Sequence, residues 1–299
     1  VHSRLGFARA ARQEELIAML PLPTFELHRP QRISDAIDLL GKFGAEATLI
    51  AGGTDLLPNM KHGLLQPQHL VSLREIDGLN RIEANRDALH IGAMTPLALI
   101  AQHEAVRERA PALAEAARSV GGPHHRAMGT IGGNLCLDTR CRYYNQTHFW
   151  RQSLGYCLKK DGSVCHVVKA GQRCVAAASN DTAAAAVALD ATLHLVGPGG
   201  MRDVKASEFY VADGRKNLAL IPSEMLVGVS IPFLSGRRSV YEKLRRRQSI
   251  DFPLLSVAAR LDVGGSTIAA LEVVVSSLAA KPRRIASVAK IANGRSTSD

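Results

Sequence analysis

The sequence predicts an α+β protein with more than one structural unit, and three observations support this class. Short apolar stretches of strand-like composition alternate with capped or alanine-rich helical stretches over most of the 299 residues. Turns rich in glycine separate these stretches. From about residue 203 the runs become mostly β-like, which predicts a smaller C-terminal α+β unit.

The composition is that of an ordinary globular protein, with 46% hydrophobic and 21% charged residues. No run of 18 apolar residues occurs, so we expect no membrane span. The N-terminus lacks the long apolar region of a secretory signal, so no such signal is expected. The net charge of +10 is scattered, and the basic run at 243–247 has no interleaved aromatics. A solvated face or an anion contact is therefore expected there, and no nucleic-acid partner.

The first elements are expected between residues 24 and 80. FELHRP predicts a short strand, and SDAIDLLGKF predicts an amphipathic helix that Ser34 caps. EATLIAGG predicts an apolar strand running into a glycine turn, and HLVSLREI predicts another strand.

The next stretch, 81–202, begins with a predicted hairpin whose turn is at 85–87, followed by a helix. ALAEAARSV predicts a second helix, and GGPHHRAMGTIGGN predicts a long turn. DTAAAAVAL predicts an alanine-rich helix that leads into two strands around a Gly-Pro-Gly-Gly turn. Beyond 203, EMLVGVSIPF, LLSVAARLDV and TIAALEVVVSSLAA predict strands of the C-terminal unit.

Two of the turns place a double glycine beside a threonine, at 51–55 (AGGTD) and 130–134 (TIGGN). Glycines allow successive backbone N–H groups to turn inward and surround an anion, where a Cβ would block a phosphate. The chain lacks the glycine fingerprints of Rossmann and P-loop sites. On the glycines alone, two ordinary tight turns are the favoured interpretation.

All five cysteines lie within 136–174. A disulfide framework is a poor interpretation, because the number is odd and no secretory signal is present. No pair has C-x-x-C spacing, which disfavours structural zinc without excluding it. The C-x₄-C-x₂-C pattern of plant-type two-iron clusters fails because Tyr144 occupies its third cysteine position.

A four-iron cluster needs four thiolates and tolerates wide spacing. Nearby cations lower thiol pKa values and offset the negative charge of such a cluster. The segment supplies cations for this purpose, among them Arg140, Arg142, Lys159, Lys160, Lys169 and Arg173. His166 is a candidate ligand, although an outer-shell or surface role suits it better. The four-iron cluster is the best interpretation from the residues, and zinc stays open.

The two glycine turns and the cysteine segment resemble the FAD-binding (medium) subunits of the molybdenum hydroxylase family, which includes xanthine and carbon monoxide dehydrogenases. AGGT-x-L at 51–56 and TIGGN at 130–134 match the family's two FAD-diphosphate loops. The resemblance runs from about residue 24 to about 290 and includes LHIGAMTPLALI, ALDATLHLVGPGG and DFPLLSVAA. It implies a PCMH-type, vanillyl-alcohol-oxidase-like FAD-binding fold of two α+β subdomains plus a smaller C-terminal α+β domain.

The resemblance also implies a division of the chain. It consists of an N-terminal extension at 1–23, FAD subdomains at 24–80 and 81–202, and a C-terminal domain at 203–299 that ends earlier than in the family. Asn134 and Asp181 stand 47 residues apart, whereas ordinary members have a much shorter connection. The extra residues, at about 137–178, contain the cysteines.

Within the family, this insertion is similar to the β subunits of 4-hydroxybenzoyl-CoA reductases, where such a segment carries a [4Fe-4S] cluster. The ligand gaps there resemble the 16, 8 and 9 residues that separate the last four cysteines here. The likeness implies that Cys141, Cys157, Cys165 and Cys174 are the ligands and that Cys136 is spare.

The likeness also implies FAD contacts, residue by residue. The diphosphate would lie along one loop and under the other, the adenosine end near an aspartate, and the flavin near a threonine, a leucine and a lysine. In this sequence these positions are Leu49, Ile50, Ala51, Gly52, Gly53, Thr54, Asp55, Leu56, Thr95, Thr130, Gly132, Gly133, Asn134, Asp181, Leu226 and Lys243. The role of Asp55 is open, because the family varies there.

The resemblance implies a cytoplasmic electron-transfer subunit without catalytic residues of its own. Its partners would be a molybdenum–pterin large subunit and a [2Fe-2S] small subunit in a dimer of heterotrimers, with ferredoxin as electron donor. Two alternatives remain. One is the FAD subunit of a hydroxylase that acts on another aromatic or heterocyclic substrate. The other, from a different class, is a zinc-binding interaction module without flavin.

Overall fold

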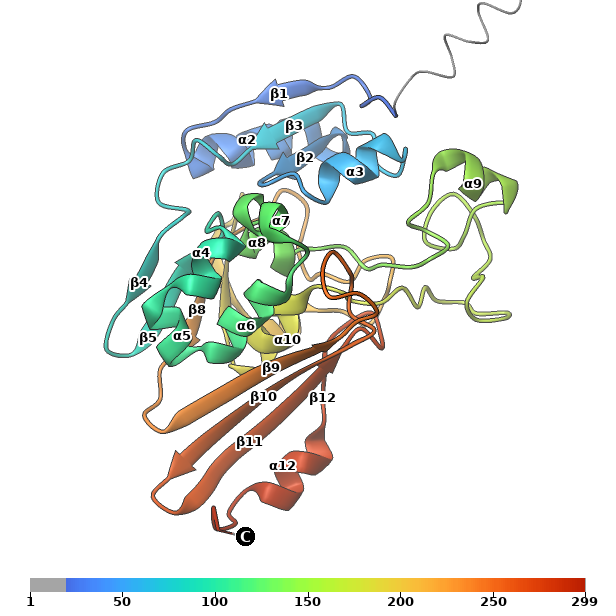
Figure 1. The fold of residues 1–299 in the computed structure, drawn as a ribbon. Coiled ribbons are helices and arrows are strands. Elements are labelled where there is room, and N and C mark those ends of the chain that lie inside the picture. Colours follow the sequence, from blue (N-terminus) through green and yellow to red (C-terminus); the bar gives the residue numbers. More distant parts are fainter. Residues whose placement is uncertain (1–19, 299) are drawn as a thin grey trace, which may run out of the picture.

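The structure is a computed structural model that describes residues 20–298. Its elements form three sheets, a group of helices and a lobe without strands (Figure 1). Most of the predicted N-terminal extension, residues 1–19, lies outside the described part of the chain. No helix among the described residues is long and apolar enough to cross a bilayer.

The first sheet is parallel and has the strand order β1-β3-β2. Its strands are β1 (Glu26–His28), β3 (His69–Ser72) and β2 (Ala47–Ile50). Helix α2 (Ile33–Phe43) packs its apolar face on this sheet, and a 3-10 turn (Gly44–Glu46) follows it. Ser34 does not cap α2, contrary to the prediction: Arg32 holds the N-cap position, and the Ser34 hydroxyl donates to the Asp35 carboxylate at 3.2 Å. The glycine turn after β2 leads into a helix that was not predicted, α3 (Leu56–Lys61).

The second sheet has the order β4-β5-β8-β6-β7, with all neighbouring strands antiparallel. Its strands are β4 (Ile82–Ala84), β5 (Ala88–Gly92), β8 (Met225–Pro232), β6 (Thr192–Gly197) and β7 (Gly200–Lys205). Strand β8 is the centre of this sheet, although the sequence analysis assigned it to the C-terminal domain. The predicted boundary at 203 therefore cuts through the sheet.

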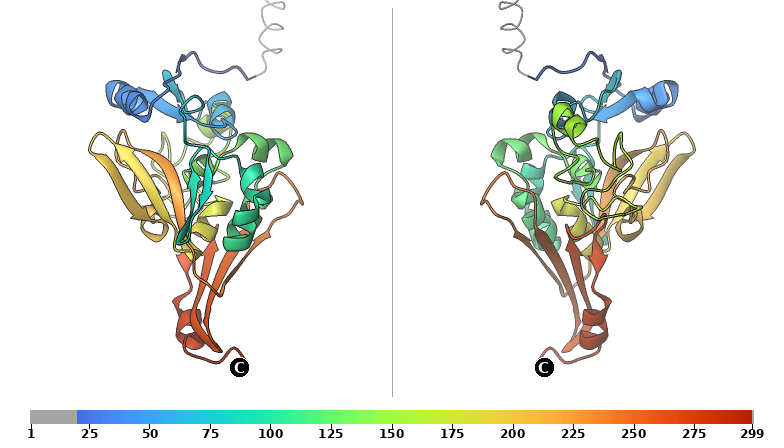
Figure 2. Two further views of the ribbon diagram at one scale, coloured as in Figure 1. Left: turned by 90° about the vertical axis from the view of Figure 1, so that its left-hand side faces the viewer. Right: turned by 90° about the vertical axis from the view of Figure 1, so that its right-hand side faces the viewer.

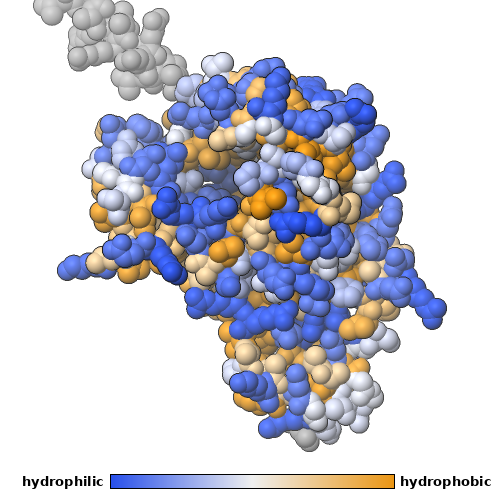
Figure 3. All heavy atoms as spheres, turned by 180° about the vertical axis from the view of Figure 1, so that it is seen from behind, coloured by the Kyte–Doolittle hydropathy of each residue, from blue (hydrophilic) through white to orange (hydrophobic). Residues whose placement is uncertain are grey.

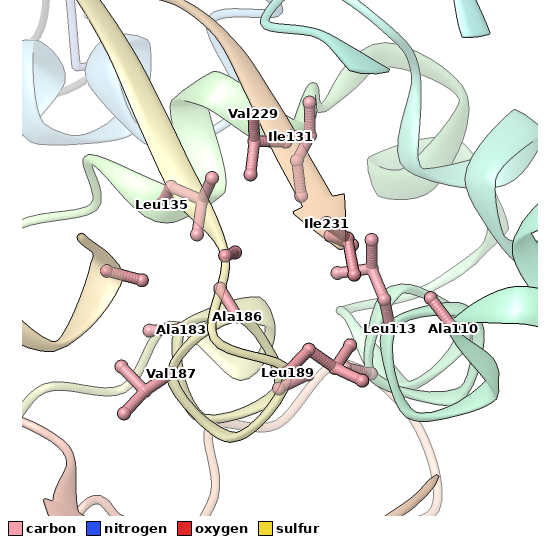
Figure 4. Close-up of a cluster of buried hydrophobic side chains, with 14 of the residues drawn as sticks. Ala110, Leu113, Ile131, Leu135, Ala183, Ala186, Val187, Leu189, Val229 and Ile231 are labelled. Carbon is pink, nitrogen blue, oxygen red and sulfur yellow. The ribbon is translucent and has the colours of Figure 1, made fainter. Parts of the chain in front are cut away.

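Helices cover the second sheet and fill the centre of the molecule. They are α4 (Leu97–Gln102), α5 (Glu104–Arg109), α6 (Pro111–Ser119), α7 (Pro123–Met128), α8 (Ile131–Leu135), α10 (Asp181–Ala188) and α11 (Ala206–Phe209). All eight residues of α10 are buried, and Figure 4 shows Ala183, Ala186 and Val187 among side chains from α6, α8 and β8. Alanine suits this position because its small side chain lets the surrounding elements approach closely. The predicted long turn before residue 134 contains α7 and α8.

The third sheet has the order β12-β11-β10-β9 and extends away from the helices (Figure 2). Its elements are β9 (Arg237–Leu244), β10 (Leu255–Gly264), β11 (Thr267–Ser276) and β12 (Arg283–Arg284), followed by α12 (Ala286–Ala292). Tyr241, Ala258 and Val274 of this sheet belong to the same buried cluster as α10. The third sheet thus shares the main core.

The cysteine-bearing segment forms a lobe at the side of the molecule, with one short helix, α9 (His148–Ser153) (Figure 1). The side chain of Arg151 is 1% exposed, donates to the carbonyl of Gly63 and pairs with Asp161 at 3.1 Å. This side chain attaches the lobe to the loop after α3. On the face opposite Figure 1, the surface is hollowed beside the lobe (Figure 3).

Candidate functional site

A cavity of about 580 Å³ lies where the first sheet, helices α4, α7 and α8, the start of the lobe and the loop after β9 meet. Both glycine motifs line it, as do the start of α10 and Leu226 of β8. This volume is within the range of roughly 300–1,000 Å³ that holds small molecules and cofactors in proteins. Segments that are distant in the sequence therefore form one binding site.

The first glycine loop leaves its backbone donors available to a ligand. In the described part of the chain, the N–H groups of residues 52–56 have no protein acceptor. Gly53 has a φ of +71°, which side-chain-bearing residues adopt only with strain. A Cβ on Gly52 would lie 1.9 Å from the carbonyl oxygen of Met128, so only glycine fits between this loop and the end of α7. The loop offers an anion several N–H donors, as the diphosphate interpretation requires.

The second glycine motif behaves differently. Thr130 caps α8, and its hydroxyl accepts from the N–H of Gly133 at 3.1 Å. The N–H of Gly132 donates to Ala93 at 2.8 Å, and the N–H of Asn134 donates to Thr130. These donors are already used within the protein. A Cβ on Gly133 would meet only the Thr130 hydroxyl, at 3.2 Å, so this glycine keeps the cavity wall open.

Asn134 supports the site through α10. Its side-chain oxygen accepts from both the N–H and the hydroxyl of Thr182, at 3.0 and 2.6 Å. Asp181 precedes Thr182 in α10 and lines the cavity. Its carboxylate accepts hydrogen bonds from the Tyr241 hydroxyl at 2.6 Å and from the Lys243 ammonium at 2.9 Å. Burial raises the pKa of Asp181, and the nearby Lys243 charge opposes this shift. Strand β9 thus holds the carboxylate at the start of α10.

Most of the predicted FAD-contact residues lie around this one cavity: Leu49, Ala51, Gly52, Gly53, Thr54, Asp55, Leu56, Thr130, Gly132, Gly133, Asn134, Asp181 and Leu226. The others do not line it. Ile50 ends β2, and Thr95 is fully buried with its N–H bonded to Gly92. Lys243 reaches the site only through Asp181.

The structure adds lining residues that the sequence analysis did not assign to the FAD site. Arg140 and Arg247 bring positive charge to the cavity, and Phe252 and His125 bring aromatic rings. Arg247 belongs to the basic run at 243–247, for which the sequence analysis expected a solvated face or an anion contact. The sequence therefore did contain a signal for this residue. Phe252 carried no such signal, because only the fold brings the loop after β9 opposite the glycine turns.

A second, much smaller cavity of about 20 Å³ lies in the lobe. The four cysteines inferred as ligands, Cys141, Cys157, Cys165 and Cys174, all line it. Among the described residues, no three cysteine sulfurs lie within 4.8 Å of one another. A tetrahedral zinc ion with Zn–S bonds of about 2.3 Å would draw its sulfurs to roughly 3.8 Å apart. The sulfurs thus surround one space, and no three of those described are as close together as a single zinc ion requires.

Cationic and polar groups adjoin these thiols. Lys159 also lines the small cavity, and its ammonium donates to Asp138 and to the Thr139 hydroxyl, each at 2.8 Å. Burial raises the pKa of Cys174, and the Lys159 charge acts in the opposite direction. His166 lines the cavity as well, with its Nε2 2.6 Å from the carbonyl oxygen of Tyr156. That contact suits a supporting role for the ring.

Cys136 lies apart from the other cysteines. It lines the large cavity, and burial raises its pKa to about 12. A raised pKa favours the protonated thiol, whereas the thiolate is the form that binds metals. Its position agrees with the inference that it is the spare cysteine.

An ion pair between Arg140 and Asp55 connects the start of the cysteine lobe to the first glycine loop. Arg140, directly before Cys141, donates to the Asp55 carboxylate at 2.6 Å, and its guanidinium lies 4.5 Å from the Phe252 ring centroid. Asp55 also accepts from Asn59 of α3 at 2.8 Å. Burial raises the pKa of Asp55, and Arg140 opposes this shift. The residue whose role was open thus connects the first glycine loop to the cysteine lobe.

Comparison with known proteins shows the family to which this chain belongs. Residues 23–234 match the family described as the FAD binding domain in molybdopterin dehydrogenase. The chain is 30% identical to the carbon monoxide dehydrogenase medium chain of Hydrogenophaga pseudoflava, over 87% of this chain and 77% of that protein. It is 35% identical to the aldehyde oxidoreductase FAD-binding subunit of Escherichia coli, over 80% of this chain and 77% of that protein.

Solved structures agree with these sequence matches. A structure of carbon monoxide dehydrogenase from Hydrogenophaga pseudoflava aligns with a TM-score of 0.75 at 28% identity, over 92% of this chain and 82% of that one. The predicted α+β FAD-binding fold is therefore confirmed. The chain belongs to the FAD-binding medium subunits of the molybdenum hydroxylase family.

Proposed function

We propose that this chain is an electron-transfer subunit that carries FAD and a [4Fe-4S] cluster in a molybdenum enzyme complex. Ferredoxin would supply electrons at the cluster, for the reductive dehydroxylation of 4-hydroxybenzoyl-CoA at a molybdenum subunit. One observation carries this proposal: four thiols surround one small cavity, and an ion pair connects that region to the FAD-binding cavity. When bound, FAD exchanges electrons in pairs and iron–sulfur centres exchange them singly.

In this proposal the first glycine loop binds the FAD diphosphate. Its free N–H groups at residues 52–56 would donate to the phosphate oxygens, and Arg140 and Arg247 would balance their charge. The second motif forms the opposite wall, where Gly133 leaves room for the ligand. Leu226 and Met94 supply apolar surface at the same cavity, as a flavin ring requires.

The cluster would be held by Cys141, Cys157, Cys165 and Cys174. Cysteine thiolates are the ligands of such clusters, and the absence of any three described cysteine sulfurs within 4.8 Å of one another suits a multi-iron cluster better than one zinc ion. Lys159 would stabilise their ionised form. Cys136 would remain a thiol at the flavin cavity.

The charge of the lobe supports an acidic electron carrier as partner. Segment 137–178 contains seven lysines and arginines but only two aspartates, and Arg142, Lys169 and Arg173 are exposed. A basic surface attracts an acidic protein and speeds their association. The partners within the complex would be a molybdenum–pterin large subunit and a [2Fe-2S] small subunit, in a dimer of heterotrimers.

A second candidate is the FAD subunit of a hydroxylase with another substrate, which passes electrons outward. The 35% identity to an aldehyde oxidoreductase FAD-binding subunit favours it. Both candidates share the flavin site and differ in the substrate, which another subunit binds.

The cluster is tested by metal analysis and absorption spectra of protein purified without oxygen. The wild type should contain about four irons and one flavin per chain. Cys157→Ser should lose the iron and keep the flavin, whereas the matched control Cys136→Ser should keep both. Colourless protein with one zinc per chain would refute the proposal in favour of a zinc-binding module. Loss of iron in the control would show that the ligand set is wrong.

The substrate is tested on the whole complex, purified through a tag on this chain. Reduced ferredoxin should reduce the flavin, and 4-hydroxybenzoyl-CoA should then reoxidise it, with the phenolic hydroxyl leaving as water. Turnover of an aldehyde or a heterocycle with electrons leaving through this chain would support the second candidate instead.

A further inference from the structure

Three side chains at the edge of the first sheet form a cluster that the flavin and cysteine sites do not use. Glu26 and His28 are two residues apart on β1, so they lie on the same face of the sheet. His69 on β3 is the register partner of Glu26. Of all described residues, these are the only three histidines, cysteines or acids whose ligand atoms all lie within 4.8 Å of one another. We propose that this cluster, His28, His69 and Glu26, binds a zinc ion.

The distances suit a metal ion. His28 Nε2 lies 3.1 Å from His69 Nδ1, and Glu26 Oε2 lies 3.4 Å from His69 Nδ1 and 3.8 Å from His28 Nε2. A tetrahedral zinc ion with bonds of about 2.0–2.1 Å places neighbouring ligand atoms roughly 3.3–3.4 Å apart. The three atoms thus outline one face of a zinc coordination tetrahedron.

Hydrogen bonding alone explains this arrangement less well. The two histidine rings share one hydrogen bond, which uses one proton. Glu26 then accepts no hydrogen bond from either ring, although its carboxylate faces both nitrogens. A cation between the three groups satisfies all of them at once.

The surroundings hold the rings and leave one side open. The ring of Phe43, the last residue of α2, stacks on His69 with 3.6 Å between centroids and on His28 with 5.2 Å. Both histidine side chains are 15% exposed, whereas that of Glu26 is 65% exposed. The ion can therefore enter from the carboxylate side, and water can complete its coordination. The C-terminal end of α2 adds a favourable dipole for a cation.

Such an ion would stabilise the pairing of β1 with β3 at the edge of the first sheet. Strand β1 has three residues and lies at the edge of its sheet, where it pairs only with β3. The cluster joins β1 to β3 through side chains. Imidazole and carboxylate together favour zinc and similar divalent transition metals over Mg²⁺ or Ca²⁺.

The test titrates the full-length, flavin-containing chain with Co²⁺ as a spectroscopic probe for zinc. The cysteine site keeps whatever metal it contains after purification. The wild type should bind one more Co²⁺ per chain than His28→Gln/His69→Gln, with d–d bands but no thiolate-to-cobalt charge-transfer band. The matched control His90→Gln/His194→Gln removes two rings that contact the Ser230 hydroxyl on the second sheet, and it should bind as the wild type does. Equal Co²⁺ stoichiometry in the wild type and in His28→Gln/His69→Gln would refute the site.

A second variant covers the case in which the double substitution prevents folding. Glu26 is exposed, so Glu26→Gln should fold normally, as flavin content and circular dichroism would show. It should weaken Zn²⁺ binding, measured by competition with Co²⁺, by about tenfold or more, since even an outer-shell partner of a metal ligand contributes that much. Unchanged affinity in Glu26→Gln would also overturn the proposal.

Discussion

Lys243 and Asp181 form an ion pair at the wall of the flavin cavity, and replacing Lys243 by methionine tests how that wall is held. Their side chains are 3% and 4% exposed, and the ammonium lies 2.9 Å from the carboxylate. Lys243 also donates to the carbonyl oxygen of Ser119 at 3.1 Å, at the end of α6. The pair thus connects β9 to both α10 and α6.

Methionine retains the length and apolar stem of lysine and removes the charge. Asp181 would keep only the hydrogen bond from the Tyr241 hydroxyl and would remain buried as an uncompensated anion. Removing one partner of a buried ion pair costs about 3–5 kcal/mol of unfolding free energy. The double variant Lys243→Met/Asp181→Asn removes both charges, so it should recover about 2–3 kcal/mol of the summed losses.

Urea unfolding of the wild type, both single variants and the double variant gives this coupling energy directly. Arg32→Met is the matched control, because its partner Asp35 is on the surface and the pair is 77% and 36% exposed. It should leave the midpoint unchanged. Additive losses in the double variant, to within about 0.5 kcal/mol, would refute the coupling of Lys243 to Asp181.

The same variant has a distinctive pH dependence. Burial already raises the pKa of Asp181 above its ordinary value of 3.8, and loss of Lys243 raises it further. The folded protein then holds a proton that the unfolded chain releases, so protonation stabilises the fold. The loss in Lys243→Met should be full at neutral pH and should shrink as the pH falls through the raised pKa towards 3.8. A loss that does not change with pH would contradict a charged Asp181.

Three further predictions concern the two cavities. Gly133→Val should fold but lose flavin, because the new side chain enters the cavity, and retained flavin would contradict the assignment of this cavity to FAD. Gly52→Ala should lose stability as well as flavin, since its Cβ would lie 1.9 Å from the carbonyl oxygen of Met128. Gly41→Ala is the control, because no atom lies within 4 Å of the new Cβ. Arg140→Gln removes the charged hydrogen bond to Asp55 and should lower the local stability of the cysteine lobe by about 1.5–3 kcal/mol. Amide hydrogen exchange should then become faster within 137–178. Exchange that becomes equally faster in all three sheets would contradict a local effect of this hydrogen bond. Cys136, with its pKa raised to about 12, should resist iodoacetamide at about pH 8, where roughly one thiol in ten thousand is ionised; rapid labelling in mass spectra of the folded protein would contradict this raised pKa.

Local signals in the sequence predicted most of the elements correctly. The apolar spacing of SDAIDLLGKF predicted α2, and the alanine run predicted α10, because helical periodicity and propensity are properties of neighbouring residues. The hairpin turn was also correct: the Asn85 side chain accepts from the N–H groups of Asp87 and Ala88. The short helices α3, α7 and α8 were missed, since glycine and proline obscure a helix of five or six residues.

The sequence by itself determined the chemistry that is available: two glycine motifs, an aspartate 47 residues beyond Asn134, and five clustered cysteines. It could not determine that Arg140, Arg247 and Phe252 share the cavity lined by both glycine motifs, or that β8 is the centre of the second sheet. Nor could it bring Glu26, His28 and His69 together, because strand pairing places residues 41 positions apart in contact. Backbone conformation and periodicity depend on near neighbours, whereas these contacts depend on strand register and on which buried faces pack together, and only the tertiary structure decides those.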